Sequence, residues 1–346
     1  MASGLVANQR DFDAIAGFLL TGSVPSPSTV IRGVRSLPAG HYLCWKSGTA
    51  TLHRYWDLTY EARDGVSVEG LRERLKDCVA RHMVSDVPMG LFLSGGVDSC
   101  ALVVLAERLA PERLNTLTVV FEDGSLSEGS AAREIAARFR TRHREVMVTE
   151  RDFRQELPRI LSAMDQPTND GVNTYFVSKA ARESGLTVAL SGLGGDEVFW
   201  GYRHYRMLSR GMRWLGRCPG PVRRLLAAGA VAAGRMRGKE NWMRLAYLKP
   251  RLSSESLYLS VRGFFAPMQV ARLLGLSETE ISAAVEKAFD FGHPAGTEGV
   301  NYIEFKRYMH DQLLRDTDVF SMTHSLEVRV PFLDHEIVDY ATSANA

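Results

Sequence analysis

Cysteine is scarce in this sequence and widely spaced. The 346 residues contain four cysteines, Cys44, Cys78, Cys100 and Cys218, and no two of them form a Cys-x-x-Cys pair. Zinc sites and disulfide frameworks are built from cysteines at short or regular spacings, so this distribution argues against both. Free cysteines are typical of a reducing compartment, and we therefore expect a cytoplasmic protein.

Long apolar runs and an excess of charge of one sign are also missing. The longest apolar stretch, residues 225–234, is too short and too rich in Ala and Gly to span a bilayer, and the first residues do not resemble a signal peptide. Lys and Arg total 42 against 40 for Asp and Glu, which gives a net charge of +2. Such a balance produces no overall attraction to nucleic acid or to a membrane, and we expect neither as a partner.

One segment is locally basic. Residues 203–244 hold eleven basic residues and a single acid, Glu240. An RNA-binding patch is one interpretation. The basic residues are spread out and few aromatics lie between them, which favours a solvated helical face whose arginines pair with acids elsewhere.

The most informative stretch reads Leu-Phe-Leu-Ser-Gly-Gly-Val-Asp-Ser over residues 91–99. An apolar run over residues 89–93 predicts a short buried strand, and a helical pattern begins near Asp98. Between them, Gly95 and Gly96 allow the backbone to approach a ligand closely. The first N–H groups of a helix and its dipole favour negative charge, so this strand, turn and helix predict an anion site, most simply for phosphate.

The residue after the glycines distinguishes this turn from a P-loop. A P-loop needs a Lys after its second glycine, whereas Asp98 follows Gly96 here. A carboxylate beside phosphates is useful if it holds Mg²⁺, which bridges carboxylate and phosphate oxygens. The alternative is an ordinary strand-to-helix turn in which Asp98 is the helix N-cap.

Strands and helices alternate through the region around this turn. We expect strands over residues 89–93, 115–121, 143–148 and 187–190, and helices over residues 68–82, 98–106, 128–139, 153–164 and 173–184. This alternation predicts an α/β fold with a doubly wound parallel sheet and a ligand at the carboxyl ends of the strands. Apolar residues make up 45% of the chain, enough for a sizeable core.

A second glycine-rich turn comes after the last of these strands. Residues 191–197 read Ser-Gly-Leu-Gly-Gly-Asp-Glu and repeat the order of strand, glycines and acids at a helix start. If the two turns lie side by side, Asp98 and Asp196 can share one Mg²⁺ on the phosphates of a nucleotide. The alternative is that Asp196 and Glu197 only cap a helix and suit its dipole.

The flanking regions give weaker patterns. We expect a helix over residues 14–20, strands over 30–34, 41–45 and 51–55, helices over 252–263, 267–274 and 301–314, and a loop over 291–299. Residues 1–57 are too few for an independent domain, so they are expected to pack on the rest of the chain.

Three segments carry a resemblance to a known family. Residues 94–99 resemble the pyrophosphate-binding loop of the ATP pyrophosphatase superfamily. Within it, the second turn and residues 314–334, which include Arg-Val-Pro-Phe-Leu-Asp, are similar to signatures of the glutamine-hydrolysing asparagine synthetases. The resemblance implies an adenine-nucleotide alpha-hydrolase-like fold with a mainly helical C-terminal part. It also implies that residues 1–57 end a class II glutamine amidotransferase domain and that residues 58–346 form an ATP pyrophosphatase domain.

The resemblance implies which residues bind the nucleotide. These are Leu93, Ser94, Gly95, Gly96, Asp98, Ser99, Val120, Ser191 and Gly192, with the backbone of Val120 against adenine. Asp98 and Asp196 are implied to hold Mg²⁺ and, with Glu197, to be catalytic.

Further acids and an arginine are implied to border the acceptor site. Glu327 and Arg329 are counted as catalytic, and Asp318 is a candidate for orienting the acceptor. A structural ion-pair network is the alternative for all three. Asp165 and Asp170 lie in a loop that would face the site, with surface turn residues as the alternative.

The implied reaction is ATP-dependent amide formation. A carboxylate, by resemblance the β-carboxylate of aspartate, attacks the α-phosphorus of Mg-ATP, pyrophosphate leaves, and ammonia then displaces AMP. The implied cofactors are ATP and Mg²⁺. The implied partners are small molecules, namely ATP, aspartate or another carboxylic acid, and ammonia, free or derived from glutamine. A homodimer is compatible with this resemblance.

The chain departs from the family pattern in three ways. Leu193 stands where the family has Glu, and Leu can neither accept a proton nor hold an ammonium. The N-terminal nucleophilic Cys of the family is missing, and the chain stops at Ala346, before the segment with a catalytic Lys. We therefore expect truncation at both ends. Three hypotheses stay open: an asparagine synthetase-type ligase, including one with another acceptor; an NAD or GMP synthetase; and a non-catalytic or partner-dependent nucleotide-binding fragment.

Overall fold

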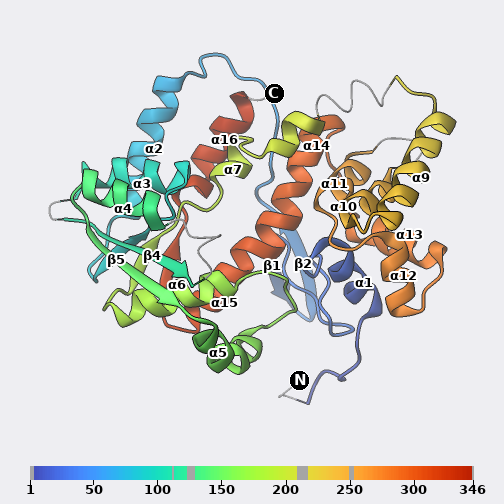
Figure 1. Cartoon of the computed structure of the whole chain (residues 1–346), viewed down its shortest axis with the longest axis horizontal. Coiled ribbons are helices and arrows are strands. Elements are labelled where there is room, and N and C mark those ends of the chain that lie inside the picture. The colour runs from blue at the N-terminus through green and yellow to red at the C-terminus, as the bar shows by residue number, and fades with distance from the viewer. Residues whose placement is uncertain (1–3, 111–112, 123–128, 209–216, 249–252, 345–346) are drawn as a thin grey trace. The chain divides into compact units, whose positions relative to one another are not determined.

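The structure is a computed structural model that describes residues 4–110, 113–122, 129–208, 217–248 and 253–344 (Figure 1). The chain divides into two compact units. Unit 1 comprises Met1–Asp57, Gln166–Asn169 and Trp200–Gln312, and unit 2 comprises Leu58–Asp165, Asp170–Phe199 and Leu313–Ala346.

Unit 2 is built on a five-stranded parallel sheet. Its strands in spatial order are β5 (Arg142–Val148), β4 (Asn115–Phe121), β3 (Met89–Phe92), β6 (Val188–Leu190) and β7 (Glu327–Arg329). The chain winds from β3 out to β5 and then crosses to β6 and β7, so the winding reverses between β3 and β6. This confirms the predicted doubly wound α/β fold, whose ligand crevice lies at the carboxyl ends of β3 and β6.

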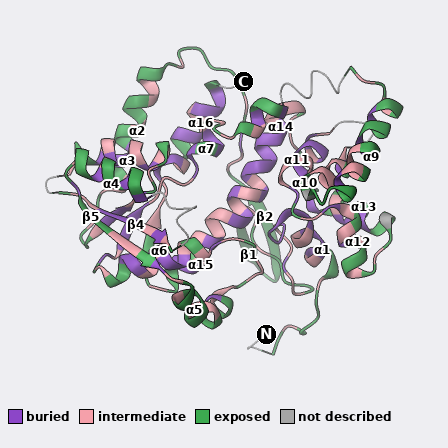
Figure 2. Cartoon of the chain, in the orientation of Figure 1, coloured by how far each residue is buried: buried purple, intermediate pink, exposed green. Residues whose placement is uncertain are grey.

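Helices cover both faces of this sheet (Figure 1). They are α2 (Val68–His82), α3 (Val97–Glu107), α4 (Gly129–Arg138), α5 (Glu150–Ala163), α6 (Val172–Glu183), α7 (Gly195–Val198), α15 (Arg315–Met322), η4 (Pro331–Leu333) and α16 (His335–Ala344). On one face, Leu91 of β3 packs with Leu102 of α3 and Ala132 of α4. On the other, Leu117 of β4 packs with Ala181 of α6. Figure 2 shows these buried inner faces against exposed outer ones.

Unit 1 is mainly helical. It contains α1 (Phe12–Thr21), β1 (His41–Lys46), β2 (Thr49–Arg54), α9 (Gly220–Met236), α10 (Glu240–Met243), η2 (Arg244–Tyr247), α11 (Ser254–Arg262), α12 (Pro267–Leu274), α13 (Glu278–Ala288), α14 (Gly296–Ile303) and most of η3 (Glu304–Leu314). Its core joins Leu20 of α1 to Leu259 of α11, Val270 of α12 and Ile281 of α13. None of the helices in the described part of the chain combines the length and hydrophobicity needed to cross a bilayer.

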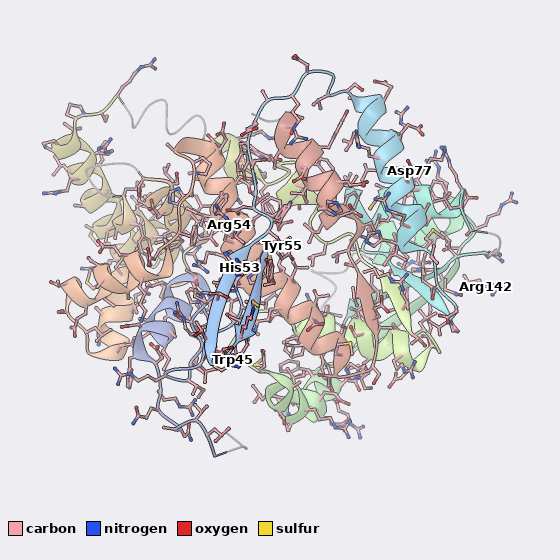
Figure 3. The ribbon with its side chains drawn as sticks, turned by 180° about the vertical axis from the view of Figure 1, so that it is seen from behind. Trp45, His53, Arg54, Tyr55, Asp77 and Arg142 are labelled. Atoms are coloured by element: carbon pink, nitrogen blue, oxygen red, sulfur yellow. The ribbon has the colours of Figure 1, made fainter. Side chains whose placement is uncertain are left out.

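The antiparallel hairpin of β1 and β2 leaves its aromatic side chains exposed. Tyr42 stacks on His53 with ring centroids 5.0 Å apart, and Tyr55 lies 6.4 Å from Tyr42. Trp45 is 69% exposed and Tyr55 is 71% exposed. Figure 3 shows Trp45, His53 and Tyr55 along this hairpin.

Most predicted elements form within about three residues of their expected bounds, and four points differ. The strand expected over residues 30–34 is wrong, because this segment makes only isolated bridges, such as that between Arg10 and Ile31. The loop expected over residues 291–299 is cut short, since α14 begins at Gly296. Strand β7, helices α10, α13 and α16, and the short 3-10 helices η2 and η4 form without having been predicted. The helix expected over residues 301–314 includes a π-helical segment, η3.

In unit 1 the buried carboxylate of Glu304 lies between two partly buried ionisable side chains, Arg262 and His204. Arg262 Nε donates to Glu304 Oε1 at 2.7 Å, and Glu304 Oε2 lies 3.7 Å from His204 Nε2. Tyr202 stacks on His204 with centroids 5.1 Å apart, and Arg262 lies over the same tyrosine ring. Burial, together with the positive charge of Arg262, lowers the pKa of His204 to about 4. Glu304 does not offset this effect because its charge is already balanced by Arg262.

We predict that unit 1 loses stability in acid because of His204. An unfolded chain protonates this histidine near pH 6.5, whereas the folded pKa is about 4. As the pH falls through this window, the unfolded state gains the proton first, so the free energy of unfolding decreases by about 2 to 3 kcal/mol. Tryptophan fluorescence during denaturant unfolding follows unit 1, since all five tryptophans belong to it. His204→Gln should lose this pH dependence, and an unchanged profile in that variant would contradict the assignment.

Gly171, at the start of α6 in unit 2, gives a second stability prediction. Its φ is 89°, and a Cβ there would lie 2.1 Å from Cε2 of the fully buried Phe320. We expect Gly171→Ala to lower the free energy of unfolding by about 3 kcal/mol, through backbone strain and overpacking together. Gly185→Ala is the control, because its φ is 83° and no atom lies within 4 Å of its Cβ; it should cost about 1 kcal/mol. Calorimetric unfolding of both variants tests this, and equal losses would disprove the Phe320 clash.

Candidate functional site

The first glycine turn joins β3 to α3, and hydrogen bonds between its two serines hold its ends together. Ser99 Oγ accepts a hydrogen bond from Ser94 N–H at 3.2 Å, lies 3.0 Å from Ser94 Oγ and donates to the Gly96 carbonyl at 3.1 Å. Gly95 has a φ of 79°, and a Cβ on it would lie 2.7 Å from Ala131 Cβ in α4. Glycine is therefore required here, both for its backbone conformation and for its close packing on α4.

The start of α3 is left without a side-chain cap. Its N-cap residue is Gly96, and no described side chain accepts a capping hydrogen bond there. Asp98 lies within the first turn, so the alternative in which it serves as the N-cap is wrong. The N–H groups of this turn and the helix dipole together would favour an anion beside the glycine turn.

The second glycine turn lies against the first. A Cβ on Gly192 would lie 2.8 Å from the Ser99 nitrogen, and a Cβ on Gly195 would lie 2.3 Å from Asp98 Cγ. Ser191 N–H donates to the Arg329 carbonyl at 2.8 Å, which ties this turn to β7. The two turns therefore lie side by side, which was the condition for a shared cation, and the absence of side chains at the two glycines permits this approach.

This contact places the carboxylates of Asp98 and Asp196 close enough for their charges to interact. Burial and the negative charge of Asp196 raise the pKa of Asp98 to about 6, while a hydrogen bond from the Asp196 backbone N–H opposes the shift. A divalent cation between the two groups would remove their repulsion. Mg²⁺ usually takes one or two carboxylates, with phosphate oxygens and waters as its other ligands. The donor set of Asp98 and the exposed Asp196 therefore fits Mg²⁺.

Glu197 has a different environment from Asp196. It is 1% exposed, whereas Asp196 is exposed. Both belong to the short helix α7, in which neither side chain is the cap. Of these two neighbours, Asp196 is thus the one open to a ligand.

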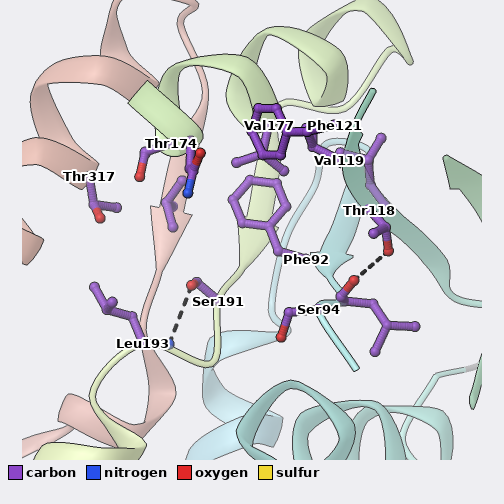
Figure 4. Close-up of a pocket in the computed structure, with 14 residues that line it drawn as sticks. Phe92, Ser94, Thr118, Val119, Phe121, Thr174, Val177, Ser191, Leu193 and Thr317 are labelled. Atoms are coloured by element: carbon purple, nitrogen blue, oxygen red, sulfur yellow. Dashed lines mark hydrogen bonds between the residues drawn. The ribbon is translucent and has the colours of Figure 1, made fainter. Parts of the chain in front are cut away.

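A cavity of about 580 Å³ opens at the carboxyl ends of β3, β4 and β6 (Figure 4). It is lined by Phe92, Leu93, Ser94, Leu117, Thr118, Val119, Phe121, Asn173, Thr174, Val177, Ser191, Leu193, Thr317 and Val328. Thr118 Oγ1 donates to the Leu93 carbonyl, and Leu193 N–H donates to Ser191 Oγ at 3.3 Å. These hydrogen bonds fix the ends of β3 and β6 at the mouth of the cavity.

The end of β4 supplies four of the lining residues, Leu117, Thr118, Val119 and Phe121. Val120, predicted to present its backbone to adenine, is buried and does not belong to the lining.

Sequence reasoning missed the contribution of two helices to the cavity. Asn173, Thr174 and Val177 come from α6, and Thr317 comes from α15. The available signals were weak: residues 173 and 177 share a face of a helix, and Thr317 precedes Asp318 in a segment already singled out.

The structure does not bring Glu327 and Arg329 to the cavity. Val328 lines it, so alternation along β7 directs its two neighbours to the opposite face. Arg329 Nη1 donates to the carbonyls of His82 and Val84, each at 2.7 Å, and its Nε donates to Glu327 Oε1 at 2.7 Å. In this arrangement Arg329 ties the end of α2 to the sheet.

The three softer candidates also lie outside the cavity lining. Asp165 forms a two-pronged ion pair with Arg315, at 3.0 and 2.7 Å. Asp170 Oδ1 accepts from the N–H of Gly171 at 2.8 Å. The carbonyl of Asp318 accepts from Ser321 Oγ at 3.4 Å within α15.

Comparison with known proteins gives a consistent picture. The family model described as Asparagine synthase matches residues 70–346. Asparagine synthetase [glutamine-hydrolyzing] 1 of Bacillus subtilis is 31% identical over 343 residues, which cover 96% of this chain and 53% of that protein. A putative asparagine synthetase [glutamine-hydrolyzing] of Mycobacterium tuberculosis is 32% identical over 351 residues, covering 96% of this chain and 52% of that protein. Amidase chry2 of Gibberella zeae is 26% identical over 361 residues, covering 91% and 53%. The chain thus spans about half the length of these relatives.

The contact between the turns gives a binding prediction. Gly195→Ala places a Cβ on the Asp98 carboxylate and must displace it. We expect the affinity for ATP in Mg²⁺ to fall at least tenfold, close to the affinity of the unaltered chain in EDTA, because the cation loses a ligand. Titration calorimetry with and without Mg²⁺ measures this, and circular dichroism checks folding. Gly229→Ala, where nothing lies within 4 Å of the Cβ, should bind normally. Full Mg²⁺ dependence in Gly195→Ala would argue against Asp98 as a ligand.

Proposed function

The chain belongs to the asparagine synthase family, and from this membership we propose that it is the ATP-using part of an amide-forming ligase. It adenylates a carboxylate, releases pyrophosphate and transfers ammonia to the activated carboxyl carbon. The β-carboxylate of aspartate is the acceptor by family resemblance.

One observation supports this proposal most directly. Two glycine-rich turns meet at the carboxyl ends of adjacent parallel strands, with Gly192 and Gly195 in contact with the start of α3. This is the reversal point of a doubly wound sheet, where nucleotide-binding sites of such folds lie. The 580 Å³ cavity begins beside the same turns.

The residues of the first turn would hold the leaving pyrophosphate. The first N–H groups of α3 and the backbone of Gly95 and Gly96 offer donors to phosphate oxygens. The serine cross-link between Ser94 and Ser99 fixes these donors before the ligand arrives, which reduces the reorganisation needed when charge moves to pyrophosphate. Asp98 and Asp196 would hold Mg²⁺, which when bound neutralises phosphate charge.

Neither step of the proposed reaction needs an oxidant or a reductant. In the first, a carboxylate oxygen forms a bond to the α-phosphorus, and the bond from that phosphorus to the bridging oxygen breaks, so pyrophosphate leaves with the electron pair. In the second, the nitrogen of ammonia bonds to the carbonyl carbon, AMP leaves with the electrons of the carbon–oxygen bond, and the nitrogen gives up a proton. The catalytic contribution of the chain is positioning and electrostatic stabilisation.

Residues 1–57 are proposed to be the end of a class II glutamine amidotransferase domain, with residues 58–346 as the synthetase domain. Two observations support this division. The chain spans about half the length of its glutamine-hydrolysing relatives. The hairpin of β1 and β2 exposes Trp45 and Tyr55, as expected of a surface that a further domain would cover. Glutamine-derived or free ammonia would then be the nitrogen source, and the cytoplasm the compartment.

Pyrophosphate exchange into ATP tests the proposal. With Mg²⁺ and an acceptor acid, the unaltered chain should incorporate labelled pyrophosphate into ATP, since adenylation is reversible. Asp98→Asn should lower the exchange rate at least 100-fold, because the isosteric amide cannot hold the cation with a full charge.

Glu150→Gln is the matched control for this test. It removes a carboxylate that pairs with Arg154 on the surface of α5, with both side chains more than 70% exposed. Its exchange rate should stay within a factor of two of the unaltered chain. Full exchange in Asp98→Asn, or none in the unaltered chain with any acid, would refute the proposed function.

A further inference from the structure

The cavity of unit 2 has two sides that come from different segments of the chain. In Figure 4, Ser94 and Thr118 lie on one side, and Leu193, Thr174 and Thr317 lie on the other. The first side continues the glycine turn that is proposed to receive the phosphates. The nucleoside of ATP therefore belongs on that side, which leaves the second side for the acceptor.

This acceptor side is made of apolar side chains, hydroxyls and one amide. The lining residues that we assign to it are Asn173, Thr174, Leu193, Thr317 and Val328. They come from α6, α15, β7 and the second turn, so four separate segments present uncharged groups to the same space.

Two arginines on the segments that line the acceptor side have partners within unit 2. Arg329 is held by two backbone carbonyls and by Glu327 on the opposite face of β7. Arg315, two residues before Thr317, forms its two-pronged ion pair with Asp165. Each of these pairs keeps its charge balanced without a ligand.

The side chain of Leu193 makes its part of the acceptor side apolar rather than charged. It is half-buried in the turn that also carries Asp196, and its N–H is fixed by Ser191 Oγ. A Glu here, as in the family pattern that the sequence resembles, would offer a counter-charge to an ammonium. Leu offers an apolar surface instead, beside Val328.

We propose that the acceptor is a carboxylic acid with an uncharged body, lacking the ammonium and second carboxylate of aspartate, and that Leu193 selects for it. This inference rests on the proposed function. None of the described residues that line the acceptor side is charged, so a charged group pressed against them would lose its water without gaining an opposite charge from them, which is strongly unfavourable. The hydroxyls of Thr174 and Thr317 and the amide of Asn173 can instead pair with neutral polar groups on the acceptor.

Four acids with carbon chains of equal length allow the effect of each charged group on binding to be measured separately. Butyrate carries only the reacting carboxylate, 4-aminobutyrate adds an ammonium, succinate adds a carboxylate, and L-aspartate adds both. Binding to the full chain with Mg²⁺ and α,β-methylene-ATP is measured by saturation-transfer NMR competition, and kcat/KM is measured by pyrophosphate exchange. We expect butyrate to exceed each charged analogue at least tenfold in both measurements.

A pair of variants tests the role of Leu193. Leu193→Glu should shift the ratio of 4-aminobutyrate to butyrate at least tenfold toward the ammonium-bearing acid. Leu193→Gln has almost the same size and no charge, so it should leave this ratio within threefold of the unaltered chain. A similar shift in both variants would overturn the charge argument.

The outcomes separate the two proposals. Preference for L-aspartate in the unaltered chain overturns the uncharged acceptor and leaves adenylation intact. Preferential binding of butyrate without exchange supports the acceptor assignment and refutes adenylation by this chain. Neither binding nor exchange with any of the acids overturns both.

Discussion

The contact between the two glycine turns is the constraint on which the rest of unit 2 depends. Gly192 and Gly195 approach Ser99 and Asp98 so closely that no Cβ fits at either position. The contact fixes the start of α3 against the end of β6 and brings two acidic groups together beside the glycine turns. The raised pKa of Asp98 results from this arrangement, since burial and a like charge both disfavour its ionised form. A cation would relieve a repulsion that the fold itself creates.

The segment around β7 shows how a sequence signature can serve the fold rather than the chemistry. Arg329 holds the end of α2 through two carbonyls, and its own carbonyl accepts the N–H of Ser191. The second turn is therefore anchored to the last strand of the sheet. Leu333 in η4 packs where a Cβ of Gly194 would be, at 2.5 Å. The Arg-Val-Pro-Phe-Leu-Asp run thus anchors the second turn and packs against it. Among the three residues of β7, Val328 is the one that lines the cavity.

The sequence predicted most of the elements of unit 2 because each carries its own local signal. Apolar runs ending in glycine marked β3 and β6, and alternation marked β4 and β5. Strand β7 has no such signal, since two of its three residues, Glu327 and Arg329, are charged, and its existence depends on pairing with β6. The strand expected over residues 30–34 failed for the converse reason, because a β-prone run without a partner strand forms none. Thr174 and Thr317 reach the cavity only through tertiary packing, which no local pattern encodes.

The proposed function assigns different parts of the site to phosphate and to acceptor, which would allow one scaffold to change its acceptor. The proposed phosphate side relies on glycines, backbone N–H groups and Asp98, all fixed by the contact between the turns. The acceptor side relies on side chains that project from α6, α15, β7 and the second turn, and any of these can be exchanged without moving a strand. Leu193 belongs to the second turn, and its side chain lines the cavity. In the proposed function its backbone would belong to the part of the site that activates the acceptor and its side chain to the part that recognises it. Exchanging that side chain would then alter which acid is bound, while the turn proposed to meet the phosphates keeps its form.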